Sequence, residues 1–213
     1  MKRILFLPIA LFLMVSAEAV TAQQMAVEAA IAHHRSNVTR ISVRNDSRLW
    51  LEGSSNVRDW TCRATALDAT IEVSNADSSG RARSEVVKGV SVRVPVRMLK
   101  CGDRHMEAHM YAALNSSDTA PGFITADVEQ IPQSVVTGQM VDAEAKLTIA
   151  GVQRRVRMSV MSDVLADGTR RARGTVPILM TDFGITPPRP WGGLLRTADR
   201  VLIQFEIFIP AQP

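Results

Sequence analysis

Two runs of alternating apolar and polar residues, separated by one glycine, constrain the fold of this chain most. Before Gly151 an apolar residue stands at every second position over residues 141–149, and after it Val152, Val156, Met158 and Val160 alternate with polar residues, with Arg154 as the one break in the apolar series. A period of two marks strands with one buried face, and a glycine between two such runs marks a tight turn. Residues 141–161 therefore predict a β-hairpin.

The same alternation recurs along most of the chain, and one segment departs from it. Alternating runs lie at residues 39–45, 48–54, 67–73, 90–98, 123–130, 135–149, 152–165, 171–181 and 201–209. Met106, Met110 and Leu114 instead recur every fourth residue, which predicts a helix over residues 103–115 with Asp103 as its N-cap. Strands at this density favour an all-β fold: a closed antiparallel barrel, or a sandwich, of about eight strands with one or two short helices. The second candidate helix is the Ala-rich segment 24–35, and the Pro- and Gly-rich segment 186–197 predicts a long loop.

Residues 1–22 have the order of a secretory signal peptide. A Lys-Arg pair precedes an apolar run over residues 4–15, and small residues that suit cleavage follow it. The run is too short for a transmembrane helix. We expect cleavage after Ala22, or alternatively after Ala19, and a single mature domain over residues 23–213 that is periplasmic or secreted. An uncleaved N-terminal anchor is the competing interpretation.

Charge and cysteine content narrow the function classes. The formal charge of the 213 residues is +4, and loss of the first 22, which carry two basic residues and one acidic residue, lowers it to +3. Basic runs with interleaved aromatics are missing and Tyr111 is the single tyrosine, so we expect no nucleic-acid binding. Cys62 and Cys101 are the two cysteines, and in an exported protein such a pair most simply forms one disulfide. A redox pair is the alternative, but it would be expected as C-x-x-C.

Two short motifs suggest chemistry that their surroundings do not support. His105 and His109 lie one helical turn apart, as metal ligands can, but no third ligand is evident, so we expect a solvent-facing stripe and no metal site. Asp182-Phe183-Gly184 spells the metal-binding triplet of kinases without the glycine-rich loop and the H-R-D motif that accompany it. No serine lies in a nucleophile elbow. We therefore expect no enzyme activity, no catalytic residue and no cofactor.

The inward-facing side chains carry the functional content. They are Val, Ala, Ile, Leu and Met, with few aromatics. In a closed barrel, small aliphatic side chains can leave an apolar lumen, and methionine adapts to a flexible ligand. A packed core gives the same alternation, so periodicity alone leaves both interpretations open.

Four segments of the chain, taken in order, match the pattern of one known family. Residues 51–62, LEGSSNVRDWTC, are similar to an early G-x-S-x-V-x-x-W segment, and residues 106–114, with Pro121 after them, to an M-x-x-x-M-x-x-A-L…P-x-I element. Residues 145–160, AKLTIAGVQRRVRMSV, are similar to an L-T-I-x-G-V-x-R-x-V hairpin, and residues 179–188, LMTDFGITPP, to a T-D-F-G-I-x-P-P segment. Together they resemble the YceI-like family of bacterial envelope proteins that bind polyisoprenoids. The Cys pair and the long N-terminal extension depart from commoner members.

The resemblance implies a lipocalin-like antiparallel β-barrel around an apolar tunnel, with no chemistry of its own. The expected ligand is a polyisoprenoid, either an isoprenoid quinone or a polyprenyl phosphate, and a transient contact with a membrane surface would accompany its exchange. The residues expected to line the tunnel are Ile41, Val43, Leu49, Leu51, Val92, Val94, Met110, Leu114, Leu147, Ile149, Val156, Met158, Phe183, Ile203 and Phe205. Arg189 and Arg196 are the candidates for binding a phosphate head group, since arginine suits phosphate. The alternative is an envelope protein that acts through protein contacts on its outer surface, with a barrel filled by side chains.

Overall fold

The computed structural model describes residues 24–25, 38–76, 84–117, 119–130 and 138–211. The chain divides into two compact units, Met1–Val38 and Thr39–Pro213. In the first, Gln24 and Met25 are helical, whereas the rest of the predicted helix and the predicted signal peptide lie outside the described residues. No helix in the described part of the chain is both long and apolar enough to cross a membrane. The fold that follows is that of the second unit.

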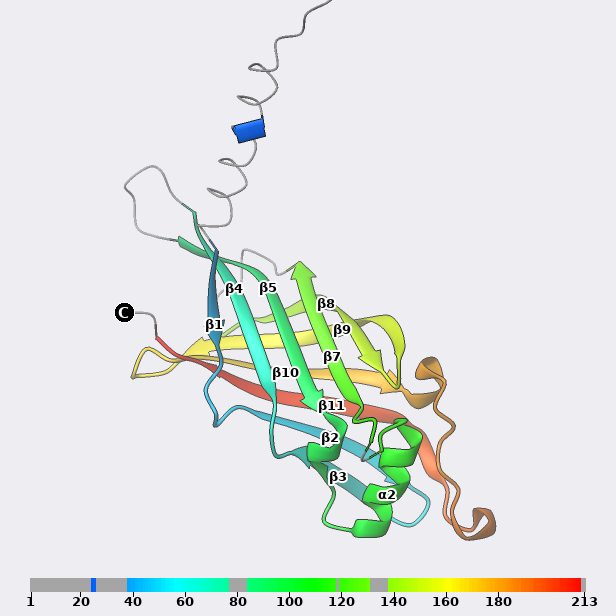
Figure 1. The fold of residues 1–213 in the computed structure, drawn as a ribbon. Coiled ribbons are helices and arrows are strands. Elements are labelled where there is room, and N and C mark those ends of the chain that lie inside the picture. Colours follow the sequence, from blue (N-terminus) through cyan, green and yellow to red (C-terminus); the bar gives the residue numbers. More distant parts are fainter. Residues whose placement is uncertain (1–23, 26–37, 77–83, 118, 131–137, 212–213) are drawn as a thin grey trace, which may run out of the picture. The chain divides into compact units, whose positions relative to one another are not determined.

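Eleven antiparallel strands form one sheet that curls into a half-barrel (Figure 1). The strands are β1 (Val38–Ser42), β2 (Arg48–Ser55), β3 (Asp59–Ala64), β4 (Asp68–Ala76), β5 (Ser84–Pro95), β6 (Leu99–Lys100), β7 (Phe123–Gln130), β8 (Met140–Ile149), β9 (Val152–Val164), β10 (Arg170–Leu179) and β11 (Thr197–Ile209). Their hydrogen-bonded order is β1-β4-β5-β7-β8-β9-β10-β11-β2-β3-β6. One α-helix, α2 (Arg104–Ala113), and three 3₁₀ turns, η1 (Val96–Met98), η2 (Met180–Phe183) and η3 (Trp191–Gly193), complete the described elements.

The all-β, antiparallel prediction is confirmed, but the expected count of about eight strands is wrong. Strands β3 and β6 were not predicted, and in the order of the described strands β1 and β6 are two separate ends. Closure into a barrel therefore stays a prediction. Strand β3 did carry a signal, because Trp60, Cys62 and Ala64 alternate with polar residues. Strand β6 has two residues, too few to show a period.

The predicted hairpin and helix are both present. Strands β8 and β9 pair from Ile149 and Val152 outward, and the turn residues Ala150 and Gly151 have φ of 51° and 82°. Positive φ at both central residues is the requirement of the tight hairpin turn whose twist matches its strands. Helix α2 begins after Asp103, whose carboxylate accepts a hydrogen bond of 2.9 Å from the backbone N–H of Met106. This satisfies one of the donors that a helix start leaves free.

The core divides into a large and a small cluster. The large cluster contains the most deeply buried side chains, among them Val94, Leu99 and Phe183. The small cluster consists of Ile41, Ile71 and Val73, with Val43 packed against it. The alternation therefore identified buried faces correctly, although these faces belong to two separate cores.

Candidate ligand-binding cavity

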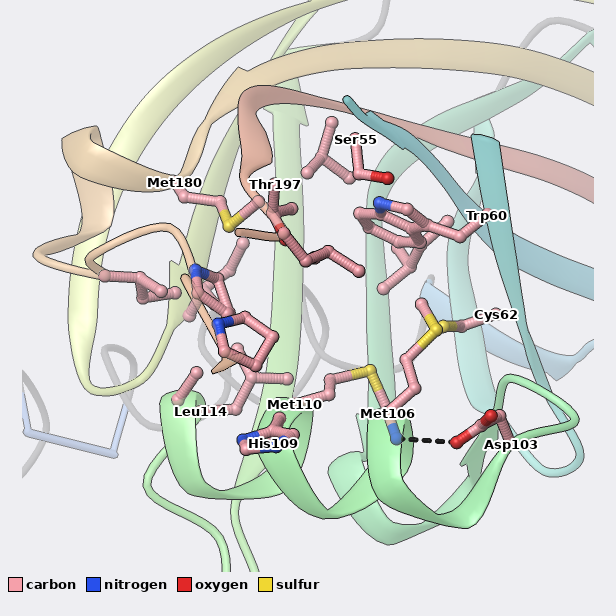
Figure 2. A pocket seen from close by; sticks show the side chains of 18 of the residues that line it. Ser55, Trp60, Cys62, Asp103, Met106, His109, Met110, Leu114, Met180 and Thr197 are labelled. Carbon is pink, nitrogen blue, oxygen red and sulfur yellow. Dashed lines mark hydrogen bonds between the residues drawn. The ribbon is translucent and has the colours of Figure 1, made fainter. Parts of the chain in front are cut away.

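A cavity of about 420 Å³ lies between α2, the inner face of the sheet and the segment that follows β10 (Figure 2). Six strands contribute apolar side chains to its wall, and these are Leu51, Trp60, Ile124, Ile149, Ile178, Val201 and Ile203. Met180, Ile185, Pro188, Pro190 and Leu195 close it from the segment between β10 and β11. A concave, mostly apolar site of this size with a few polar groups is typical of small-molecule binding.

Helix α2 covers the cavity with one face. Met106, Met110, Ala113 and Leu114 recur at helical spacing and line the cavity, as the period of four predicted. Figure 2 shows the Met106 and Met110 side chains directed toward Trp60 and Cys62 of β3. Because methionine is unbranched and flexible, this wall can adapt to chains of different shape.

Polar contacts on the other side of α2 hold it against β6. The buried Tyr111 hydroxyl donates to the Leu99 carbonyl at 2.8 Å and accepts from Lys100 Nζ at 2.9 Å. The Glu107 carboxylate accepts a 2.9 Å hydrogen bond from the Cys101 backbone N–H, which is the main reason that the pKa of Glu107 lies below its ordinary value. The position of the helix is thus set by contacts outside the cavity.

The predicted disulfide is present and forms part of the wall. Cys62 is fully buried in β3, and its bond to Cys101 joins that strand to the segment before α2. The Met110 sulfur lies 3.9 Å from Cys101 Sγ, so sulfur atoms of the helix and the disulfide meet on one side of the cavity. The bond links two elements that both contribute lining side chains.

Six polar residues line the cavity. They are Ser55, Arg58, Asp103, His105, His109 and Thr197, and of these Arg58 and both histidines are exposed, which places them where the cavity meets solvent. The Ser55 hydroxyl donates to the Arg58 carbonyl at 2.8 Å, which shapes the turn between β2 and β3. The hydrogen bond from Met106, together with the charges of His105 and Arg58, keeps the pKa of Asp103 below its ordinary value. Arg58 therefore places a guanidinium group at the mouth of an apolar cavity, beside the Asp103 carboxylate.

The structure brings together some of the residues predicted to line a tunnel and separates others. Leu51, Met110, Leu114, Ile149 and Ile203 line the cavity. The large core cluster also contains residues that do not line this cavity, and these are the buried Leu49, Val94, Leu147, Met158 and Phe183 and the half-buried Val92, Val156 and Phe205. Ile41 and Val43 belong to the small one. The interior is therefore packed with side chains over most of its length and hollow at the α2 end.

The predicted head-group residues do not line the cavity, whereas an unpredicted arginine does. Arg189 and Arg196 are exposed in the segment between β10 and β11, and Arg58 occupies the position at the mouth that we had expected of them. The sequence feature by which Arg58 could have been found is its position two residues before Trp60, inside the segment 51–62 that resembles the family. Among the described residues no three His, Cys, Asp or Glu side chains gather as a metal site would require.

A family model of the YceI-like domain matches residues 20–209. The chain belongs to the YceI-like family. Burkholderia cenocepacia BcnA superimposes with a TM-score of 0.57 at 20% identity, covering 78% of this chain and 98% of its own. A polyisoprenoid binding domain from Saccharophagus degradans, implicated in plant cell wall breakdown, gives a TM-score of 0.57 at 13% identity, covering 82% and 99%. These likenesses show the fold. A search of curated protein sequences gave no match.

In this YceI-like chain, all four segments that carry the resemblance meet at the cavity. The early segment supplies Trp60, the helical one Met110, the hairpin Ile149, and the late one Met180 and Ile185. These segments are far apart in sequence and lie in different elements of the fold. Their convergence makes the cavity the best candidate for the functional site.

Proposed function

We propose that this YceI-like protein binds a polyisoprenoid lipid, with the apolar tail in the cavity and the head group at the mouth beside Arg58. The observation that carries the proposal is an apolar cavity of about 420 Å³ with an exposed arginine at its edge. Burial of the tail would contribute about 0.8 kcal/mol per methylene before the cost of ordering it. The solved polyisoprenoid binding domain with the same fold supports this ligand class.

The volume of the cavity limits the length of tail that it holds. Since an apolar cavity of about 150 Å³ accommodates one benzene molecule, a volume of about 420 Å³ corresponds to on the order of 17 carbon atoms, or about three isoprene units. Ala113 and Ile185 also border an adjoining cavity of about 320 Å³. A longer tail would have to continue past these two residues.

The charge at the mouth favours an anionic head group. Arginine binds phosphate with a planar set of donors and stays charged at every physiological pH. His105, His109 and Asp103 border the same opening. Of the two expected ligands, a polyprenyl phosphate fits this mouth better than a neutral quinone.

We also propose that the protein is not an enzyme, that it acts in the periplasm and that its sheet closes into a barrel. The Ser55 hydroxyl and the Asp103 carboxylate are both engaged in hydrogen bonds that shape the backbone, which supports a binding protein and not an enzyme. The signal-like residues 1–22 support action in the periplasm. Because β5, η1 and β6 are one continuous segment, and β6 pairs with β3, this segment joins an interior strand near the β1 end to the β6 end of the sheet, which supports a closed barrel.

Two alanines on α2 provide a matched test. Ala113 lines the cavity and Ala112, its neighbour, is exposed, so Ala113→Phe fills the cavity while Ala112→Phe adds the same side chain outside it. Native mass spectrometry of the exported protein should find one isoprenoid per chain in the parent and in Ala112→Phe, and much less in Ala113→Phe. Arg58→Gln should weaken binding of a polyprenyl phosphate more than binding of a quinone with the same tail.

The proposal fails if the folded parent carries no isoprenoid and takes none up from detergent. It also fails if Ala113→Phe, with near-native melting, keeps the ligand as well as Ala112→Phe does. Thermal melting of both variants separates loss of binding from loss of folding.

A further inference from the structure

Two loops at the mouth of the cavity are joined by hydrogen bonds. Asn56, in the turn between β2 and β3, donates from its side-chain amide to the Leu194 carbonyl at 2.9 Å. Its side-chain oxygen accepts from the Arg196 backbone N–H at 2.7 Å, and its own backbone N–H donates to the Arg196 carbonyl at 3.1 Å. The two loops therefore form one surface, which we call the mouth rim and define as residues 56–58 and 189–196.

Among the side chains of the mouth rim that the structure describes, two are large, apolar and exposed. Val57 is 67% exposed and Leu194 is 78% exposed; Val57 follows Asn56, and the Leu194 carbonyl accepts one of the hydrogen bonds that join the loops. Single exposed apolar residues are common on soluble proteins. Here, however, their neighbours Arg58 and Leu195 line the apolar cavity, so the exposed apolar surface adjoins the cavity opening.

The charge on the mouth rim is positive. Arg58, Arg189 and Arg196 are all exposed. Two acidic residues lie near the rim. Asp59 is on the outer face of the sheet, because side chains alternate along β3 and Trp60 faces the cavity, whereas Asp103 borders the cavity near Arg58. Exposed apolar side chains next to arginines are the combination that binds the interface of an anionic bilayer.

We propose that the mouth rim docks on the surface of an anionic lipid bilayer, with Val57 and Leu194 entering the interface and the three arginines contacting lipid phosphates. The opening of the cavity would then face the bilayer, and a lipid tail would pass between the two without crossing water. This docking goes beyond lipid binding in the cavity and does not require the cavity to be filled.

Vesicle sedimentation with the mature exported chain tests the docking. The probes are phosphatidylcholine vesicles with and without phosphatidylglycerol. The parent should bind the anionic vesicles more tightly, and added salt should weaken this binding. The double variant Val57→Ser with Leu194→Ser should weaken vesicle binding by about tenfold for each side chain. The double variant Arg189→Gln with Arg196→Gln should weaken binding by about fivefold for each charge, and only on anionic vesicles.

Matched controls lie outside the mouth rim. Met140 and Val164 are 64% and 53% exposed, and Met140 is nine residues along β8 from the cavity residue Ile149, or about 31 Å. Met140→Ser with Val164→Ser should leave vesicle binding unchanged, as should Arg154→Gln with Arg155→Gln, which removes two exposed charges from β9.

Three outcomes would overturn the docking proposal: no binding to anionic vesicles, equal binding to both vesicle types, or equal losses in the mouth-rim and control variants. The lipid content of the purified protein gives an independent reading. If the parent protein carries isoprenoid but does not bind vesicles, the docking proposal alone is refuted. If it binds vesicles but never carries isoprenoid, the cavity proposal alone is refuted. Melting temperatures confirm that each variant is folded.

Discussion

At the scale of single residues, two glycines make room for aromatic rings on the inner face of the sheet. Gly53 of β2 pairs with Trp60 of β3, and Gly174 of β10 pairs with Phe205 of β11. A Cβ placed on either glycine would overlap the ring of its partner. The missing side chains therefore fix the positions of both rings, and the Trp60 ring in turn forms part of the cavity wall.

We expect Gly53→Ala to destabilise the protein by roughly 1–3 kcal/mol, because the new methyl group displaces the Trp60 ring. The same change in a Trp60→Ala background removes the overlap. There it should be neutral or stabilising, since alanine loses less backbone entropy than glycine on folding. Free energies of unfolding in urea for the four proteins of this double-mutant cycle measure the difference. Equal costs in both backgrounds would contradict the account.

Residue-scale patterns predicted which side chains are buried but not what they face. Leu147 and Ile149 stand two positions apart on the same face of β8, yet Leu147 packs in the core and Ile149 lines the cavity. Alternation reports only that a face is removed from water. The distinction depends on where α2 lies across the sheet, which no local pattern encodes. For the same reason Arg58 was missed, since its importance comes from its place at the mouth.

At the scale of elements, an ion-pair network on the outer face connects three strands. Arg171 of β10 contacts Asp163 of β9 through two hydrogen bonds, of 2.9 and 2.7 Å, and lies 3.6 Å from Glu206 of β11. Arg173 adds a third contact to Asp163, at 3.2 Å. The hydrogen bonds from Arg171 are the first reason that the pKa of Asp163 lies below its ordinary value.

A pH titration of stability should detect this network. Because the pKa of Asp163 is lower in the folded than in the unfolded protein, its contribution is fully present above the unfolded value, about 3.9, and is lost as the pH falls through the folded value. Asp163→Asn should therefore be less stable than the parent at neutral pH, and the difference in unfolding free energy should shrink below about pH 4. Asp59→Asn, which removes an exposed carboxylate from β3, is the control variant for this titration. A difference that is constant down to pH 2 would show that the pKa shift plays no part.

A second element-scale prediction concerns the disulfide. Cys62 and Cys101 are 39 residues apart, and their bond restricts the unfolded chain while holding the start of α2 next to β3. Replacing both by alanine should destabilise the protein by up to roughly 4 kcal/mol in the entropic model. Urea unfolding of the double variant, and of the parent with and without reductant, measures this. Alkylation without reductant should modify no cysteine of the exported parent, and two modified thiols would contradict the bond.

Helices and strands were predictable where the segment was long enough for its pattern of apolar residues to repeat several times. The β8–β9 hairpin and α2 were recognised because each shows several repeats and a clear start or turn signal. The three apolar positions of β3 followed its period of two but lay inside a segment that had been recognised only as a family motif. Pro95 ends the interior strand β5, where its missing N–H removes no ladder hydrogen bond from the middle of the strand.

At the scale of the whole molecule, the sequence order of the strands differs from their order in space. Strand β2 pairs with β11 across more than a hundred residues, with Leu51 opposite Ile203. Both residues line the cavity, so the site exists only when β2 and β11, far apart in sequence, have paired. Such long-range pairing is not contained in local periodicity, and the family resemblance, not the pattern of any strand, predicted an interior with room for a ligand.

The complete fold should therefore be stabilised by its ligand. A ligand that binds the folded chain alone adds RT ln(1 + [L]/Kd), or about 2.7 kcal/mol at a hundredfold excess over Kd. Removing bound lipid by unfolding and refolding should lower the melting temperature, and adding a polyprenyl phosphate with about three isoprene units, the length that the cavity volume suggests, should restore it in a concentration-dependent way. Ala112→Phe should respond as the parent does and Ala113→Phe should not, since only the second substitution fills the cavity. If the ligand raises the melting temperatures of both variants equally, it binds elsewhere on the protein, and the cavity is not the site.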